Sequence, residues 1–130
     1  MSPRGPARSA LDMWIGRWIN TDPAVATADV YEWAPSGAFV LHTADAAIEM
    51  IDYDEASGRF TSRLVDSQGN VALHTLTAHG DTWTYEGDAT RATVEFSADH
   101  RVQTVLHERT DDGTTYRPAS RVRLVKVSSR

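Results

Sequence analysis

The chain of 130 residues contains no cysteine. A disulfide framework and a thiolate metal site are therefore excluded, and a cytoplasmic location is the default expectation. Long apolar runs are also missing, since none approaches the ~20 residues that a membrane-spanning helix needs. No apolar stretch follows Arg4 and Arg8, so we expect no signal peptide and no membrane partner.

Basic residues are in the minority, with 13 against 18 acidic residues and a net charge of −5. Six of the 13 lie near the two ends: Arg4, Arg8, Arg121, Arg123, Lys126 and Arg130. The middle of the chain is therefore acidic and would repel a phosphate backbone. Nucleic acid is not an expected partner.

Helical periodicity is also scarce, because no apolar 3.6-residue period persists beyond one turn. Instead, short strand-like segments alternate with turns rich in Gly, Asp and Asn, the pattern of antiparallel hairpins. After a first strand at Trp18, these segments are 30–33, 38–43, 48–53, 59–66, 71–78, 82–87, 91–97, 101–110 and 120–127. We predict one all-β domain over residues 9–130, with about ten strands, a short helical turn at Ser9–Met13 capped by Ser9, and a disordered leader at 1–8.

Several of these strands carry polar and apolar side chains on both faces. In 30–33, Tyr31 and Trp33 oppose Val30 and Glu32. A sandwich has one dry and one wet face, whereas a closed barrel can point polar groups at a ligand and apolar groups at a partner. The mixing favours a single antiparallel up-and-down β-barrel. Outward apolar residues, as in 71–78, also make a homodimer an expectation.

The first and last strands carry a recognisable combination of residues. Gly16 and Trp18 form a G-x-W, and Arg121 and Arg123 lie in the final strand. This resembles the calycin group of barrels, which includes lipocalins, fatty-acid-binding proteins and nitrobindin-like proteins. The stretches VYEWAPSGAFVLH, IDYDEASGRFTSRLVDSQGN and HERTDDGTTYRP are similar to a bacterial family of calycin-like barrels of unknown function. The resemblance implies that Trp18 closes one barrel end and that a final-strand arginine packs on its ring, worth ~0.5–2 kcal/mol.

The five histidines show no metal-binding spacing. His79 and His100 lie in predicted turns, while His42, His74 and His107 lie within predicted strands. No H-x-H or H-x-x-x-H pair occurs, so we expect no metal site and no cofactor. The resemblance to nitrobindin-like barrels leaves haem binding as an alternative, with His107 as the candidate axial ligand.

Carboxylates within strands are the more informative polar groups, because Asp and Glu are depleted there unless paired or exposed. Glu49 lies next to the segment that contains Arg63. If its face points inward, Glu49, Arg63 and His42 or His74 would form a buried cluster that orients a ligand or moves a proton. Glu49 and His74 are the candidate catalytic residues. Salt bridges on the outer face are the competing interpretation.

Aromatic residues complete the candidate pocket, with core packing as the alternative explanation. The candidate ligand-binding residues are Tyr31, Trp33, His42, Arg63, Trp83, Tyr85 and His107. Apolar pockets with a few placed polar groups are typical small-molecule sites. We therefore predict binding of a small, largely apolar or aromatic metabolite. A cofactor-free cyclase or isomerase of secondary metabolism is the alternative, and whether a reaction is catalysed stays open.

Overall fold

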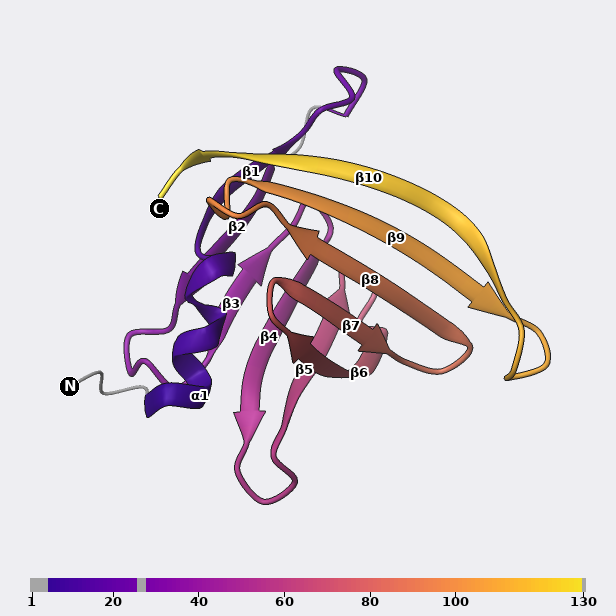
Figure 1. Cartoon of the computed structure of the whole chain (residues 1–130), viewed down its shortest axis with the longest axis horizontal. Helices are drawn as coiled ribbons and strands as arrows, with labels where there is room; N and C mark the ends of the chain where they lie inside the picture. The colour runs from indigo at the N-terminus through magenta and orange to yellow at the C-terminus, as the bar shows by residue number, and fades with distance from the viewer. Residues whose placement is uncertain (1–4, 26–27, 130) are drawn as a thin grey trace.

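The computed structural model describes residues 5–25 and 28–129 as a closed antiparallel barrel of ten strands (Figure 1). The strands are β1 (Gly16–Asn20), β2 (Ala28–Trp33), β3 (Val40–Thr43), β4 (Ala47–Asp54), β5 (Arg59–Asp66), β6 (Val71–His79), β7 (Thr82–Glu86), β8 (Thr90–Phe96), β9 (Val102–Thr110) and β10 (Tyr116–Ser128). Each pairs with its neighbours in sequence, and β1 closes the ring on β10. The predicted all-β, up-and-down barrel is confirmed.

Alternation along the strands decides which side chains enter the barrel. In β5, Phe60 and Ser62 are buried, while Arg59, Thr61 and Arg63 are exposed. Phe60 pairs with Leu76 of β6 and with Tyr53 of β4, so the inward layer continues from strand to strand. Because successive strand residues point to opposite faces, one register fixes the whole lining.

A short helical segment covers one end of the barrel. The α-helix α1 (Gly5–Ser9) runs into the 3₁₀ helix η1 (Ala10–Trp14), which buries Leu11 and Trp14 in the core. The helix begins at Gly5, so residues 5–8 are helical where a disordered leader was expected, and 1–4 lie outside the described residues. The expected cap is also absent: the Ser9 hydroxyl donates to the carbonyl oxygen of Gly5, within α1.

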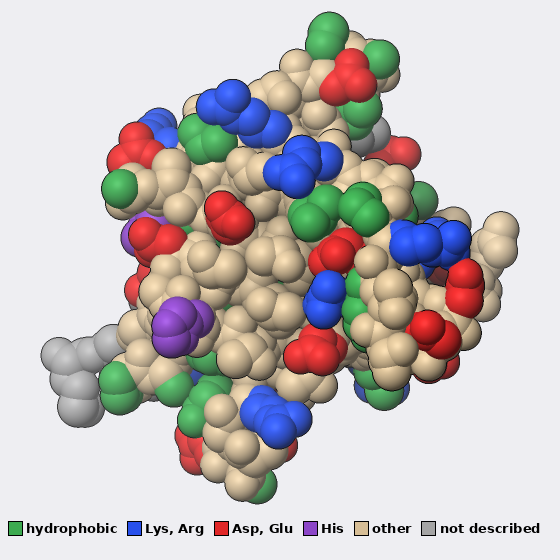
Figure 2. Space-filling model, turned by 45° about the vertical axis from the view of Figure 1, so that its right-hand side comes forward, with side chains coloured by type: hydrophobic (Ala, Val, Ile, Leu, Met, Phe, Trp, Pro, Cys, Tyr) green, Lys and Arg blue, Asp and Glu red, His purple; other side chains and the backbone are tan. Residues whose placement is uncertain are grey.

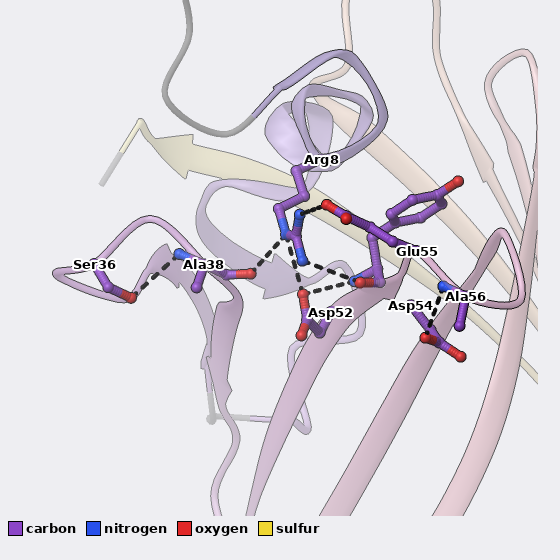
Figure 3. A network of polar contacts seen from close by, with 8 residues as sticks. Arg8, Ser36, Ala38, Asp52, Asp54, Glu55 and Ala56 are labelled. Atoms are coloured by element: carbon purple, nitrogen blue, oxygen red, sulfur yellow. Dashed lines mark hydrogen bonds and ion pairs between the residues drawn. The ribbon is translucent and has the colours of Figure 1, made fainter.

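Arg8 fixes α1 to the neighbouring barrel rim (Figure 3). Its Nε donates to the carbonyl oxygen of Ala38 at 3.0 Å and to Asp52 Oδ1 at 3.2 Å. Its terminal nitrogens donate to Glu55 Oε1 at 3.2 Å and to the carbonyl oxygen of Tyr53 at 3.1 Å. One guanidinium thus ties the helix to both the β2–β3 turn and the end of β4, and holds the cover in place.

Beneath the helix, tryptophans close this end of the barrel. Trp18 is fully buried and its indole N–H donates to the carbonyl oxygen of Trp14 at 2.9 Å. Trp14 also packs edge-on against Trp83 and Phe96, with ring centroids 5.7 and 4.9 Å apart. Trp18 therefore lies in a buried aromatic layer beneath the helix. We call this apolar layer the closed end.

The cation on Trp18 differs from the one expected. Lys126 Nζ lies 5.1 Å from the centre of the Trp18 ring, and the two residues are partners in the β1–β10 register. Arg121 and Arg123 are exposed on the outer face of β10. They precede Lys126 along β10 and pair with Leu106 and Thr104 of β9. Neither arginine is paired with a residue of β1, the strand that carries Trp18. The prediction of an arginine on this ring is wrong.

Gly16 is required where the first strand begins. Its φ is +140°, and a Cβ at this position would lie 2.6 Å from the backbone oxygen of Ser128. A side chain would therefore separate β1 from the end of β10, where the barrel closes. The close approach of β1 and β10 thus explains the glycine of the G-x-W pair.

The outer surface differs between faces. On the face in Figure 2, acidic and basic side chains are interspersed and hydrophobic ones lie in small, separate groups. On β4, β5 and β6, large hydrophobic residues point outward: Ile48, Val65 and Val71 pair across the three strands. In the next outward position, Met50 and Leu73 lie on either side of Arg63. No helix in 5–25 or 28–129 is both long and apolar enough to span a membrane.

Candidate functional site

The other end of the barrel holds a cavity of about 620 Å³. Its apolar lining includes Leu64, Val94, Val105, Val122 and Leu124, and its aromatic lining is Trp14, Tyr31 and Tyr85. Its ionisable lining consists of Asp29, His42, Glu49, His74, Arg91, His107, Glu108 and Arg109. We call this half of the interior the open end. The volume suits a small molecule, since such sites are ~300–1,000 Å³.

A chain of hydrogen bonds runs along one wall, from β2 to β5. His42 Nε2 lies 2.7 Å from Asp29 Oδ1, and His42 Nδ1 lies 2.7 Å from Glu49 Oε1. The Ser62 hydroxyl donates to the other Glu49 oxygen. Glu49 is only 5% exposed, so this carboxylate sits inside the barrel with both oxygens bonded. We call Asp29, His42 and Glu49 the acid wall.

The acid wall favours a protonated imidazole. Burial lowers the pKa of His42, but the hydrogen bonds and charges of Asp29 and Glu49 raise it further, so the net shift is upward. With both ring nitrogens facing carboxylates, the imidazolium can donate on both sides. Tyr31 stacks on this ring at 3.9 Å, nearly parallel at 11°. The three ionised groups therefore carry one net negative charge.

Two tyrosines next to the acid wall stay protonated. Burial raises the pKa of Tyr31 well above its usual value, and the charges of Glu49 and Asp29 raise it further. Tyr85 behaves in the same way, with burial first and the Glu49 charge second. Both phenols are therefore neutral hydrogen-bond donors inside a negatively charged site.

His74 faces the same cavity from β6. Its ring lies edge-on to Tyr85, with centroids 5.9 Å apart. A Cβ on Gly87 would lie 2.6 Å from His74 Cδ2, so the imidazole occupies space that only a glycine leaves free. His74 does not contact the acid wall through any hydrogen bond among the described residues, and its Nδ1 is buried without a partner.

Three buried nitrogen atoms in the described part of the chain lack hydrogen-bond partners: Trp14 Nε1, His74 Nδ1 and Gln103 Nε2. All three side chains line the cavity. Trp14 and Gln103 are each only 1% exposed. A buried polar group without a partner costs ~1–3 kcal/mol. The unpaired groups of the described interior thus gather around one cavity instead of being scattered through the core.

The mouth of the cavity carries the opposite charge. Arg91 makes a two-nitrogen ion pair with Glu108, at 3.1 and 3.3 Å, and Arg109 lies exposed beside it. His107 also lines this rim, and partial burial lowers its pKa, which keeps it neutral. In a ring of ten strands, β8 and β9 are five positions from β3 and β4, so this rim lies across from the acid wall.

The structure brings some predicted site residues together and separates others. Those that line the cavity are Tyr31, His42, Glu49, His74, Tyr85 and His107. Arg63 points outward on β5, opposite the exposed Met50, so it is not in the expected cluster with Glu49. Trp83 is fully buried at the closed end, where its N–H donates to the sulfur of Met13. Trp33 also lies away from the cavity, bonded to Asp12 Oδ1 at 2.9 Å.

Four contributors were missed: Trp14, Asp29, Ser62 and Gln103. Asp29 was missed because β2 begins two residues earlier than predicted. Ser62 and Gln103 could have been found from the sequence, since each lies on the same strand face as a buried apolar residue, Phe60 and Val105 respectively. Trp14 precedes the first strand, and no periodicity points it into the barrel.

A scan of the chain against models of known protein families gives no match, and a search of curated proteins gives none either. The fold defines the chain as a ten-stranded antiparallel β-barrel compatible with a calycin-like architecture. The resemblance to one bacterial family stays a prediction. Among the described residues, no three His, Asp or Glu side chains are placed to hold a metal ion.

Proposed function

We propose that this protein binds a small organic molecule inside the open end of its barrel. The observation that carries the proposal is that Trp14, His74 and Gln103, each with a buried nitrogen that lacks a hydrogen-bond partner, all line one cavity. Apolar and aromatic side chains would hold the body of the ligand, and the polar groups would orient it. We therefore expect a ligand whose surface is mostly apolar or aromatic, as predicted, and which also carries at least one polar group.

Tryptophan fluorescence tests this proposal, because Trp14 lines the cavity. We expect saturable quenching by one chemical class within a panel of aromatic and apolar metabolites. Ala92→Phe is the informative variant, since Ala92 lines the cavity and a phenyl ring there would occupy it. Leu73→Ala, on the outer face, is the control. Binding that survives Ala92→Phe in a folded protein would contradict this location.

A cofactor-independent proton-transfer enzyme, such as a cyclase or isomerase, is the second candidate. It is favoured by the continuous hydrogen bonding from Glu49 through His42 to Asp29, which is partly solvent-exposed. Such a chain could pass a proton between a bound molecule and water, with Glu49 exchanging the proton and His42 holding its carboxylate. His74 was also a predicted catalytic residue. In this candidate function it lines the cavity and is given no proton-transfer step.

Hydrogen exchange separates the enzyme from the carrier. An enzyme would catalyse deuterium incorporation from D₂O into the bound compound, detected by NMR, and Glu49→Gln would abolish it even at compound concentrations that saturate the variant. A carrier would bind the compound without exchange in either protein. Haem is tested in the same panel: a Soret shift with hemin that is lost in His107→Ala would support it.

A further inference from the structure

The acid wall suggests what kind of ligand the cavity takes. We propose that the cavity binds a small organic ammonium ion, with its positive charge held by Asp29 and Glu49. This inference rests on the proposed function and adds to it the charge of the ligand. It concerns binding, and it holds whether or not a reaction follows.

The acid wall carries a negative charge that its own histidine does not fully compensate. Asp29 and Glu49 contribute two negative charges and His42 one positive charge, at contacts of 2.7 Å on both sides. The basic residues that line the cavity, Arg91 and Arg109, belong to the opposite rim, and Arg91 is already paired with Glu108. An uncompensated charge in a poorly solvated site favours a counter-ion.

The carboxylates of the acid wall can accept further hydrogen bonds. Each carboxylate oxygen accepts up to two hydrogen bonds. Asp29 uses one oxygen for His42, and no hydrogen bond from the described residues reaches its other oxygen. Asp29 also lines the cavity. Its side chain is 27% exposed, which makes it the more accessible half of the acid wall. An ammonium group has three donors to offer and no acceptor, which matches this side of the cavity.

Aromatic side chains lie beside the carboxylates of the acid wall. Trp14 lies 5.3 Å from Tyr31 and 6.0 Å from Tyr85, measured between ring centroids, and all three line the cavity. Aromatic faces attract organic cations, by ~0.5–2 kcal/mol for each well-placed ring. The same rings would pack against an apolar ligand body, so they suit an amine carried on an aromatic or aliphatic skeleton.

An independent observation places a second polar group on the ligand. Gln103 is 1% exposed, lines the cavity and leaves its amide nitrogen without a partner. It lies on β9, five strands from Glu49 on β4, and therefore on the opposite wall. We therefore expect the ligand to carry a hydrogen-bond acceptor for the Gln103 amide, at the end away from its ammonium group.

Isothermal titration with three compounds of similar shape tests the charge: 2-phenylethylamine, 2-phenylethanol and phenylacetate. We expect the amine to bind at least about tenfold more tightly than the alcohol, with phenylacetate weakest; a tenfold change corresponds to about 1.4 kcal/mol. 4-Methoxyphenethylamine, which adds an acceptor oxygen at the end of the ring away from the ammonium group, should bind more tightly than the amine, and Gln103→Leu should remove only that gain.

Variants of the acid wall assign the effect. Asp29→Asn and Glu49→Gln should each weaken amine binding about tenfold and leave the alcohol unchanged. Glu32→Gln is the matched control, because it removes one negative charge from the outer face of the same strand as Asp29. If one acid-wall variant fails to fold, judged by circular dichroism, the other still decides.

The outcomes separate the two proposals. Equal binding of alcohol and amine, or tighter binding of phenylacetate, would overturn the ammonium inference and leave the binding function standing. A preference for the amine that Asp29→Asn and Glu49→Gln do not change would also overturn it. Failure of all the compounds to bind would overturn the binding function itself, together with the inference.

Discussion

The two ends of this barrel are built from the same strands but satisfy their side chains differently. At the closed end, the indole N–H groups of Trp18 and Trp83 both have partners, and aromatic rings fill the space. At the open end, a cavity remains, a carboxylate is buried, and unpaired nitrogens are kept by His74, by Gln103 and by Trp14, which lines the cavity and also packs on the closed end. The contrast indicates that the closed end provides stability, whereas the open end gives up some stability for a polar site.

Trp83→Ala at the closed end should have the largest effect on stability. Trp83 is fully buried and packs edge-on against Phe60 and Trp14. Removing such a side chain leaves a cavity and costs ~3–5 kcal/mol. Urea unfolding followed by circular dichroism measures the change in the free energy of unfolding. A loss under about 1 kcal/mol would contradict the assigned role of this end.

Gly87→Ala tests the packing around His74. The added methyl would lie 2.6 Å from the imidazole, so either β7 or the His74 ring has to move. Overpacking of this kind costs ~1–3 kcal/mol. The double variant Gly87→Ala with His74→Ala should recover much of that loss in the same unfolding experiment. No recovery would mean that the added methyl is limited instead by Thr90 Oγ1, which would lie 3.1 Å from it.

Gln103→Leu should stabilise the protein without ligand, by about 1 kcal/mol, because it removes a buried amide that lacks a partner. This sign is opposite to that expected for substitutions at the closed end. A rise in the unfolding midpoint would sharpen the contrast between the two ends. A clear loss of stability would show that the amide is satisfied within the folded protein.

Lys126→Met should cost ~0.5–1 kcal/mol, because it removes the cation from the Trp18 ring. Arg121→Met and Arg123→Met, on the outer face of the same strand, should change the free energy of unfolding by no more than about 0.5 kcal/mol. Comparable losses in all three variants would contradict the assignment of Lys126 as the stacking cation.

The pH dependence of stability isolates the acid wall. Because the pKa of His42 is raised on folding, its stabilising contribution is complete below the unfolded value of about 6.5. The contribution is lost as the pH rises through the higher folded pKa. His42→Gln should flatten the decline of stability above pH 6.5, whereas His79→Gln, at the exposed end of β6, should not. Parallel curves for wild type and His42→Gln would exclude a raised pKa.

Local pattern alone predicted most of the fold. The alternation of side chains and the Gly- and Asp-rich turns located strands such as 59–66, which match the observed bounds of β5. The resemblance carried by the G-x-W pair implied that Trp18 closes the barrel, and Trp18 is fully buried beneath the helix. The start of β2 was set two residues late, because Asp29 is a poor strand former and its place there depends on pairing with Trp18 of β1.

The sequence by itself determined that the chain forms a meander of short strands, since alternation and turn chemistry act over a few residues. It also supplied Glu49, His42 and Tyr85 as candidates for one site. Only the tertiary structure decided that Arg63 points outward, that Asp29 completes the acid wall, and that Lys126 rather than an arginine covers Trp18. These outcomes depend on strand register and on barrel closure, which bring together residues far apart in the chain. A slip of one residue in the register would move every side chain of a strand to the other face.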